Sequence, residues 1–387
     1  MKFDNQLRHA AGIIHAYKGE TPLHIWLKDF FRVNKQMGSR DRKLLGNLVY
    51  GFYRLGKAVQ QMPVEERLLL GLFLSNENPG ELLEYFRPEW NPQAGCPPEE
   101  KIAIARASGI GIVAEDIFPY KDELSAGIDH HAFCLSFLKQ PDLFCRIRPG
   151  HQQAVLEKLS GHHHTFIPPF TLRLPNGFKV EEYFTPDKEV VIQDYSSQRI
   201  AGFLQEPSAP RNFWDACAAS GGKSILAVDC YPAMDITVSD LRESILHNLR
   251  QRFRQAGIQK YHAFLVDLTV PQSVATSAGP FDLILADVPC TGSGTWSRTP
   301  EELYFFDPQK IDRYSAMQKK IIANIIPRLA TKGHLVYSTC SVFKKENEAM
   351  TTLIRESFAL KLENAGAVKG YEDRADTMFA ARFARAF

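Results

Sequence analysis

Residues 212–228 constrain the fold most, because they join a strand pattern to a helix pattern through a run of small residues. Residues 212–217 have the composition of a buried strand, and residues 223–228 begin a helix pattern. The residues between them are Ala218, Ala219, Ser220, Gly221 and Gly222. Small residues let a backbone approach a ligand closely, and a helix N-terminus offers unpaired N–H groups. The pattern is typical of a nucleotide-type cofactor loop in an α/β sheet.

Strand and helix patterns alternate from about residue 193 to the end of the chain. This alternation predicts an α/β Rossmann-like, doubly wound sheet over residues 193–387. Residues 1–138 show apolar residues at helical spacing and are expected to form an all-helical domain. Residues 139–192 are expected to form a small α+β module, in which Phe144–Arg148 alternates like a strand with its basic residues on one face.

Composition places the chain among ordinary globular proteins. With 387 residues, it is long enough for two or three domains of roughly 100–200 residues each. Hydrophobic residues make up 44% and charged residues 23%. No segment approaches the ~18 consecutive apolar residues of a membrane span. Residues 1–6 carry no apolar signal core, so we expect no membrane association and a cytoplasmic location.

Neither a disulfide framework nor a metal site is expected. The seven cysteines are irregularly spaced and include no Cys-x-x-Cys pair, unlike a disulfide-stapled or zinc-binding chain. The run His162-His163-His164 contains possible metal ligands, but it lies beside Gly161 and Pro168-Pro169. An exposed loop is the better interpretation of that run, and no metal is predicted.

Charge is distributed unevenly although the whole chain has a net charge of only +2. Residues 1–60 contain 11 Lys and Arg against 4 Asp and Glu, whereas residues 61–130 contain 5 against 13. Such asymmetry suggests a directed electrostatic face. A nucleic-acid partner and a solvated helix surface are both compatible with it.

Two cofactor classes fit the loop. Gly222-Lys223-Ser224 imitates the end of a P-loop, but that motif needs a glycine at position 217, where Cys217 stands. S-adenosylmethionine in a Rossmann-like sheet is the other class. Asp240 ends the next strand pattern 25 residues after Asp215, where an acid binds ribose hydroxyls. Asp267, which follows 27 residues later, could accept a hydrogen bond from an adenine amino group. Either aspartate alone could instead be a helix N-cap. Two such caps would rarely coincide with this strand order, so S-adenosylmethionine is the favoured cofactor.

Two cysteines stand at the ends of apolar, strand-like runs. Cys290 closes the run that begins at Asp282, and Cys340 closes the run that begins at His334. Catalytic groups gather at the carboxyl ends of strands in open α/β sheets, so the pair suggests thiol-dependent group transfer. A small buried hydrophobe is the other interpretation of a cysteine. A buried, unreactive cysteine is the favoured interpretation of Cys96, Cys134, Cys145 and Cys230. Cys217 is expected to line the cofactor loop and to take no part in the reaction.

Several motifs, taken together, resemble one protein family. They are Asp215–Lys223, Asp287–Cys290, Ser338–Ser341 with Glu346-Asn347, Gln193-Asp194 with Ser197-Gln198, and the strand-like Asp376–Ala380. With them the chain resembles the RsmB-like and NOL1/NOP2/Sun family of RNA cytosine-5 methyltransferases. Ser39–Arg42 and Val49–Arg54 are similar to the NusB-like domain of the bacterial ribosomal RNA enzymes. The module at 139–192 matches the family's RNA-binding subdomain in position.

The resemblance implies a role for each reactive residue. Carbon 5 of cytosine is a poor nucleophile, and a thiolate added to carbon 6 activates it. The resemblance assigns Cys340 as that nucleophile and Cys290 as the thiol that assists release. Asp287 would hold the N3/N4 edge of cytosine, and Lys223 would lie between cofactor and base. Spacing alone would also permit the two cysteines to exchange roles, as in DNA cytosine-5 enzymes, while Pro289-Cys290 disfavours an adenine-N6 enzyme.

The chain departs from the family pattern at three positions. Ser220 replaces the usual proline of the cofactor loop, which is expected to loosen that turn. Val288 replaces the usual alanine, and Ile245 stands where relatives often carry arginine. None of these changes removes a reactive group, so they indicate a divergent branch.

The sequence therefore predicts a monomeric, S-adenosylmethionine-dependent RNA cytosine-5 methyltransferase that acts on small-subunit ribosomal RNA. Methylation of transfer RNA, a P-loop-like NTPase and a non-catalytic RNA chaperone remain alternatives. The predicted catalytic residues are Cys340, Cys290, Asp287 and Lys223. The predicted cofactor-binding residues are Cys217, Ala218, Ala219, Ser220, Gly221, Gly222, Lys223, Asp240, Asp267 and Asp287.

Overall fold

The computed structural model describes residues 2–205, 209–271 and 279–385. These residues form two compact units. The first unit contains the described residues within 1–122, 129–141 and 295–307, and the second those within 123–128, 142–294 and 308–387. The small module therefore groups with the large sheet, and residues 295–307 group with the helical start of the chain. The predicted division into three domains, at 1–138, 139–192 and 193–387, is finer than these two units and stays a prediction.

The first unit is helical, as the apolar spacing predicted. α3 and α4 touch backbone to backbone, because a Cβ added at Gly71 would lie 2.3 Å from the carbonyl oxygen of Gly51. Gly38 is the N-cap of α3, and Ser39 is the first residue of the helix. The helices are α1 (Lys2–Ala16), α2 (Leu23–Val33), α3 (Ser39–Arg54), α4 (Val64–Ser75), α5 (Glu81–Phe86), α6 (Pro98–Ala107), α7 (His130–Ser136) and α14 (Pro300–Tyr304).

A four-stranded antiparallel sheet begins the second unit. Its order is β2-β3-β1-β4, and alternate residues of β1 and β3 enter one small core with α8. The strand predicted at residues 144–148 is confirmed as β1. The elements are β1 (Leu143–Ile147), α8 (Gln152–Lys158), β2 (Thr165–Ile167), β3 (Thr171–Leu174), α9 (Val180–Tyr183) and β4 (Val190–Ile192).

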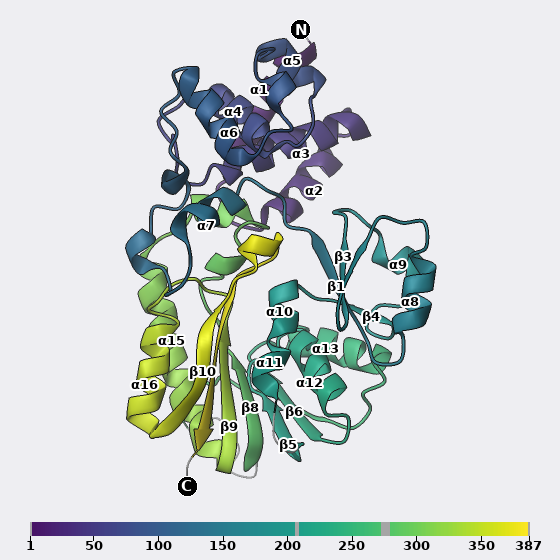
Figure 1. The fold of residues 1–387 in the computed structure, drawn as a ribbon, viewed down its shortest axis with the longest axis vertical. Helices are drawn as coiled ribbons and strands as arrows, with labels where there is room; N and C mark the ends of the chain where they lie inside the picture. Colours follow the sequence, from purple (N-terminus) through teal and green to yellow (C-terminus); the bar gives the residue numbers. More distant parts are fainter. Residues whose placement is uncertain (1, 206–208, 272–278, 386–387) are drawn as a thin grey trace. The chain divides into compact units, whose positions relative to one another are not determined.

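A seven-stranded mixed sheet forms the rest of the second unit, in the order β10-β11-β9-β8-β5-β6-β7. β5 to β9 are mutually parallel, and β11 is antiparallel to its neighbours. The predicted Rossmann-like sheet is thereby confirmed (Figure 1). The strands are β5 (Asn212–Asp215), β6 (Asp235–Asp240), β7 (His262–Leu265), β8 (Phe281–Asp287), β9 (Leu329–Thr339), β10 (Leu360–Val368) and β11 (Met378–Arg385).

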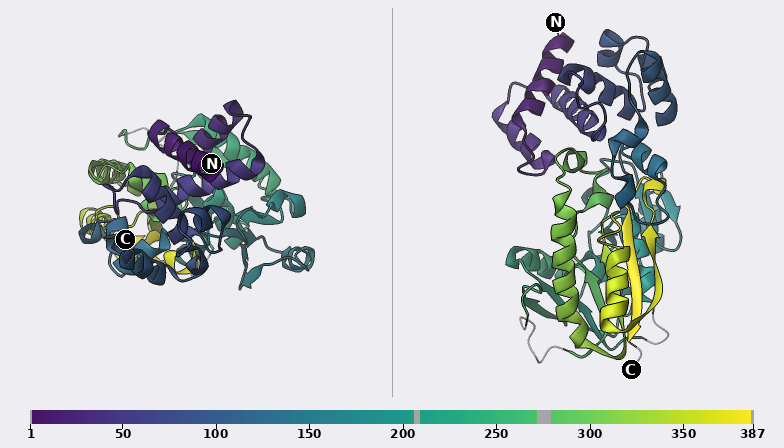
Figure 2. Two further views of the ribbon diagram at one scale, coloured as in Figure 1. Left: turned by 90° about the horizontal axis from the view of Figure 1, so that it is seen from above. Right: turned by 90° about the vertical axis from the view of Figure 1, so that its left-hand side faces the viewer.

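Helices cover both faces of this sheet. Neighbouring strand residues enter opposite cores: Phe213 packs with α12 and α13, whereas Trp214 packs with α15 and α16. Figure 2 shows α15 and α16 lying side by side along the sheet. The α-helices are α10 (Tyr195–Arg199), α11 (Ala201–Leu204), α12 (Gly222–Cys230), α13 (Glu243–Gln255), α15 (Gln309–Ile325) and α16 (Glu348–Phe358). Short 3₁₀ turns are η1 (Asn91–Gln93), η2 (Ala114–Ile117), η3 (Lys121–Glu123), η4 (Ser293–Thr295), η5 (Ile326–Arg328) and η6 (Tyr371–Asp373).

The strand order reverses between β5 and β8. After β5 the chain adds β6 and β7 on one side, then adds β8 and β9 on the other. Ligands of open α/β sheets bind at the carboxyl ends of the strands, beside such a reversal. The loops that follow β5, β8 and β9 are therefore the part of the sheet where a site is expected.

The basic face of β1 is buried rather than offered to solvent. Arg146 and Arg148 both pair with Asp229 near the end of α12, and this pairing attaches the small sheet to the large one. The histidine run predicted to be a loop lies in an exposed turn before β2, where His162 contacts the ring of Tyr183. Within the part of the chain that the structure describes, no helix combines the length and the apolar character needed to cross a membrane.

Candidate active site

The loop between β5 and α12 adopts a conformation that larger residues would not allow. Gly221 has a φ of 83°, and a Cβ placed on it would lie 2.9 Å from Cε1 of Phe253. Ala219 also has a positive φ, of 46°. The loop thus leaves backbone groups and small side chains in front of the N-terminus of α12, where unpaired N–H groups favour a polar ligand.

One pocket brings together most of the predicted site residues. Its lining includes Asp215, Cys217, Ala218, Ala219, Ser220, Gly222, Lys223, Asp287 and Cys340. Gly221, Asp240, Asp267 and Cys290 are not part of this lining. The pocket is also lined by residues that the sequence analysis recognised only as motifs, or not at all, namely Ile192, Gln193, Asp194, Ser197, Arg252, Asp376 and Met378.

Lys223 and Asp287 form an ion pair inside this pocket. Nζ of Lys223 donates to Oδ2 of Asp287 at 2.7 Å, and the hydroxyl of Ser338 donates to Oδ1 at 2.7 Å. Burial opposes the charge of Lys223, but Asp287 and the negative charge that Cys340 can carry raise its pKa above the usual lysine value. The lysine therefore stays protonated, and it holds a carboxylate whose two oxygens are both fixed.

The two predicted reactive thiols are in direct contact. Cys290 lies three residues beyond β8, and Cys340 follows the last residue of β9. The hydrogen bond that the Cys290 thiol donates to Cys340, together with burial and the nearby charges of Cys340 and Glu346, raises the pKa of Cys290 well above the usual thiol value. Cys290 is therefore a neutral thiol near pH 7, while Cys340 is the one whose side chain lines the pocket.

Glu346 and Asn347 tie the two thiol-bearing loops together. The fully buried carboxylate of Glu346 accepts from the backbone N–H and the hydroxyl of Thr291, at 3.1 and 2.9 Å. Asn347 donates to the carbonyl of Ser341 at 2.8 Å and accepts from Thr339 at 2.6 Å. Sequence reasoning included this pair in a motif but gave it no role, and its positions along the chain do not reveal these contacts.

Asp240 and Asp267 are partly occupied by local hydrogen bonds. The carboxylate of Asp240 accepts from the backbone N–H groups of Ala219 and Arg242, at 3.1 and 3.0 Å. Asp267 accepts from the N–H and hydroxyl of Thr269, at 2.9 and 2.6 Å, which lowers its pKa. Because a carboxylate offers about four lone-pair sites, each acid keeps capacity for a ligand.

Two exposed leucines lie beside Asp240 and were not among the predicted site residues. Leu241 is 60% exposed and Leu265 is 55% exposed, and Leu265 is the register partner of Asp240 across β6 and β7. Apolar side chains at strand ends are expected to be buried, so their sequence pattern gave no indication of exposure. They offer an apolar surface at the carboxyl edge of the sheet, next to the predicted ribose-binding acid.

The unusual Ser220 is fixed by an arginine from α13. Nη1 of Arg252 donates to both the carbonyl and the hydroxyl of Ser220, at 3.1 and 3.0 Å. The same guanidinium binds the buried carboxylate of Asp187 through Nε and Nη2, at 2.9 and 2.7 Å. Arg252 thus restrains the turn that lacks the usual proline, and the loosening expected at Ser220 stays a prediction.

Comparison with known proteins finds a family match over the residues that form the site. Residues 203–379, which carry the loop, the acids and both thiols, match the family described as 16S rRNA methyltransferase RsmB/F. Over these residues the chain matches the RsmB/F family of methyltransferases. The resemblance inferred from the motifs is confirmed, and the cofactor of RsmB/F enzymes is S-adenosylmethionine.

Two similar relatives of the RsmB/F domain carry ribosomal names. One, from Xanthomonas campestris, is named ribosomal RNA small subunit methyltransferase B and is 32% identical over 164 residues, which cover 41% of this chain and 36% of the relative. The other, from Bacillus subtilis, is named probable ribosomal RNA small subunit methyltransferase B. It is 32% identical over 184 residues, which cover 46% of this chain and 39% of the relative. The matched segment thus spans well under half the length of these relatives.

A likeness in fold extends beyond the RsmB/F domain. The crystal structure of PH0851 superposes on this protein with a TM-score of 0.65. The superposition covers 92% of this chain and 93% of the PH0851 chain. Because the sequence identity is 16%, this likeness concerns the fold alone.

The RsmB/F pocket fits a cationic cofactor such as S-adenosylmethionine. Asp215 is 1% exposed, and burial raises its pKa to about 7 even though Ser224 donates to it at 2.6 Å. Its other oxygen, Oδ1, has no hydrogen-bond partner among the described residues. A buried carboxyl group with one oxygen left without a hydrogen bond favours a positively charged ligand, and S-adenosylmethionine carries sulfonium and ammonium groups.

Replacing Asp215 with asparagine should change how stability depends on pH. Because the folded-state pKa is raised, ligand-free wild-type protein loses stability as the pH rises from about 4 to about 7, while Asp215→Asn has no such loss. We expect the melting temperature of Asp215→Asn relative to wild type to increase between pH 5 and pH 7.5, as measured by calorimetry without ligand. Asp267→Asn is the matched control, because the pKa of Asp267 is lowered and its difference from wild type should be flat in this range. A pH-independent difference for Asp215→Asn would contradict the assignment.

Proposed function

We propose that this protein transfers a methyl group from S-adenosylmethionine to carbon 5 of a cytosine in RNA, and that its substrate is small-subunit ribosomal RNA. The observation that carries the proposal is the contact between two thiols beside the ion pair of Lys223 and Asp287. The match to the RsmB/F family and the ribosomal names of the relatives support the choice of reaction and substrate.

Cys340 is the nucleophile in this proposal. It lines the pocket, and its thiolate would form a bond to carbon 6 of the cytosine, which turns the ring into an enamine that is nucleophilic at carbon 5. S-adenosylmethionine, when bound, supplies a methyl group activated by its sulfonium leaving group. The ammonium group of Lys223 is close enough to Cys340 for their charges to attract each other.

Cys290 acts after the methyl transfer. The proton on carbon 5 must leave before the sulfur–carbon 6 bond can break, so a base is needed at that moment. The hydrogen bond to Cys340, burial and the charge of Cys340 together hold the pKa of Cys290 high, and bonding Cys340 to carbon 6 removes the last of these, its negative charge. The Cys290 thiol then gives its proton to solvent water more easily, and the resulting thiolate accepts the carbon 5 proton, directly or through water, so that the sulfur–carbon 6 bond breaks and Cys340 leaves as a thiolate.

Asp287 orients the target base. Its carboxylate is fixed by Ser338 and Lys223, and it lies at the end of β8 three residues before Cys290. An acceptor held in this way can bind the amino group of cytosine and stabilise a proton on N3, where positive charge develops during attack at carbon 6. In the same proposal Asp240, Asp267 and the exposed Leu241 and Leu265 hold the adenosine part of the cofactor.

The remaining parts of the chain would bind RNA. We assign the helical unit to the NusB-like class because of its motifs Ser39–Arg42 and Val49–Arg54. We assign the small sheet to RNA recognition because of its position in the chain. The target cytosine must leave its stack to meet both thiol and methyl donor, which favours an unpaired or incompletely assembled region. We expect a monomer that acts where ribosomal RNA is made, in the cytoplasm.

Methyl transfer to defined RNAs tests this function. Purified protein should transfer label from methyl-labelled S-adenosylmethionine to small-subunit ribosomal RNA, and sequencing should locate 5-methylcytosine at one position. Label in transfer RNA instead would favour the alternative substrate. Absence of methylation with hydrolysis of nucleoside triphosphates would favour a P-loop-like NTPase, and absence of both activities would leave the RNA chaperone.

A further inference from the structure

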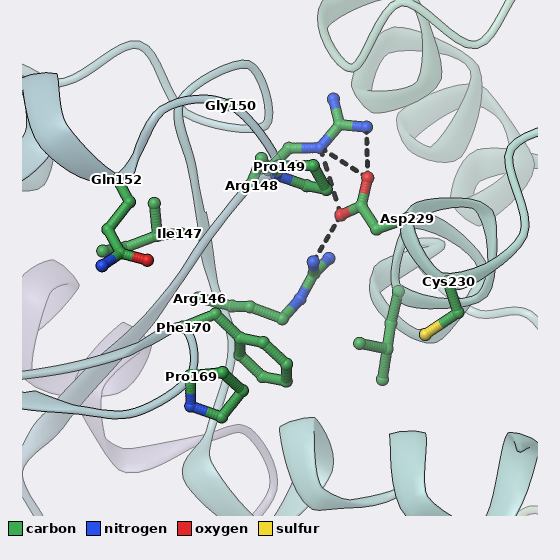
Figure 3. Close-up of a pocket in the computed structure, with 11 residues that line it drawn as sticks. Arg146, Ile147, Arg148, Pro149, Gly150, Gln152, Pro169, Phe170, Asp229 and Cys230 are labelled. Atoms are coloured by element: carbon green, nitrogen blue, oxygen red, sulfur yellow. Dashed lines mark hydrogen bonds and ion pairs between the residues drawn. The ribbon is translucent and has the colours of Figure 1, made fainter.

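A second pocket lies where the small sheet meets α12, and the proposed reaction makes no use of it. Figure 3 shows it between the turn that follows β1 and the last residues of α12. Its lining combines two arginines and one aspartate with a proline, a phenylalanine ring and the exposed residue Cys230. All of these belong to the second unit.

Arg146 has one donor group without a partner in this pocket. Its Nε donates to Oε1 of Gln193 at 3.0 Å, and its Nη1 pairs with Asp229. Its Nη2 is buried and has no hydrogen-bond partner among the described residues, while the whole side chain is 2% exposed. A buried guanidinium N–H left without an acceptor costs free energy, which an acceptor brought by a ligand would recover.

The charges around Arg146 favour an anion. Arg148 also uses Asp229, through Nη2 at 2.6 Å and Nε at 3.1 Å, so one carboxylate serves two guanidinium groups. Asp229 is the one acid among the residues lining the pocket. Burial raises the pKa of Cys230, so its thiol adds no negative charge near pH 7. The lining thus carries one uncompensated positive charge.

The opposite wall is flat and apolar. Pro169 and Phe170 come from the segment before β3, and Figure 3 shows the Phe170 ring below the guanidinium of Arg146. Phe170 is partly exposed, and its hydrogen bond within the sheet is made by its backbone carbonyl, which accepts from Ile147 at 2.7 Å. An aromatic face beside a cationic group is the combination that binds a nucleotide, through its phosphate and its base.

Arg146 also connects this pocket to the active site. Gln193, which its Nε holds, lines the active-site pocket. Along α12, Gly222 lines the active-site pocket, while Leu226 and Cys230 line the second one. They lie four to eight residues further on, which is roughly 6–12 Å at ~1.5 Å per residue. A nucleotide close to the target base along one RNA strand could span this separation.

We propose that this pocket binds a nucleotide of the RNA substrate that flanks the target cytosine, with its phosphate on Arg146 and its base against Phe170. This inference rests on the proposed function, since it needs an RNA substrate in the neighbouring pocket.

Two variants and one control test the proposal in the full-length protein. Arg146→Gln removes the charge and leaves Arg148 paired with Asp229, and Phe170→Leu removes the aromatic face but keeps an apolar side chain. Arg355→Gln is the control, because Arg355 is an exposed arginine of α16 that pairs only locally with Glu356. The probe is a short single-stranded oligouridine RNA with one central cytosine, and its affinity is measured by fluorescence anisotropy over a range of salt concentrations.

We expect Phe170→Leu to weaken RNA binding roughly fivefold or more, as the loss of a stacked base does. Arg146→Gln should weaken it and also reduce the slope of log affinity against log salt by about 0.7, the loss of one phosphate contact on a single strand. A purely structural role would not change that slope. Ultraviolet crosslinking should attach RNA to the tryptic peptide 159–173, which contains Phe170.

Three results would overturn the inference. Affinities and salt slopes of both variants equal to those of Arg355→Gln would exclude a nucleotide site here. Binding of free cytidine monophosphate as tightly as the oligonucleotide, with equal loss in Arg146→Gln, would indicate a free-nucleotide site rather than an RNA contact. If wild-type protein neither binds the RNA nor methylates any RNA, the proposed function itself fails, and the inference fails with it.

Discussion

Replacing Cys290 with alanine is expected to trap RNA on the protein. In the proposed mechanism Cys340 forms a bond to carbon 6, and that bond breaks only after a base removes the carbon 5 proton. Cys290 is in hydrogen-bond contact with Cys340 and is the group assigned to that step. Without it, the methylated adduct should accumulate. With RNA and S-adenosylmethionine present, the variant should give a band of lower mobility on a denaturing gel, and protease should remove it.

The controls separate attack from release. Cys340→Ala should form no adduct and should lose methyl transfer by roughly three orders of magnitude or more, as removal of a nucleophile does. The double variant Cys290→Ala/Cys340→Ala should also form none. Cys96→Ala removes a cysteine of the helical unit, far along the chain from either thiol motif, and should behave as wild type. An adduct that appears in Cys340→Ala but not in Cys290→Ala would mean that the two thiols exchange roles, which their spacing alone permits.

The sequence was most informative where a feature depends on a short stretch of chain. Each thiol follows an apolar strand, and parallel strands bring their carboxyl ends to one edge, so β8 and β9 place Cys290 and Cys340 together. The tight loop at Gly221 is a similar case, because the positive φ of this glycine is a property of the loop and does not depend on distant residues. Such features are encoded within about ten residues and can be predicted.

Features that depend on distant partners could not be predicted. The alternation in Phe144–Arg148 indicated a basic face, but the acid that buries it, Asp229, lies about 80 residues further along the chain. Likewise, nothing near Ser220 indicates that Arg252 would hold it. The grouping of residues 295–307 with the helical unit is also long-range, because it depends on contacts such as that between Leu23 and Glu301.

Replacing Asp287 with asparagine should slow methyl transfer by roughly two to three orders of magnitude, the usual cost of losing one electrostatic group that acts on the transition state. Asparagine keeps the size of the side chain, but its single amide oxygen can accept from only one of Ser338 and Lys223, which donate to different oxygens of Asp287. It cannot supply the negative charge that stabilises a proton on N3 of the cytosine. The rate should be measured in single turnovers with saturating RNA and cofactor, so that binding and chemistry are separated.

Ser338→Ala is the matched control, because it removes one hydrogen bond to Asp287 and leaves the carboxylate charge in place. We expect it to cost at most about tenfold, close to the contribution of one hydrogen bond to a charged group. The combination Asp287→Asn/Cys290→Ala then locates the affected step. If Asp287 assists attack, the adduct that accumulates in Cys290→Ala should form slowly in the double variant. If the adduct forms there at the rate of Cys290→Ala alone, Asp287 acts after attack, and its assigned role at N3 is wrong.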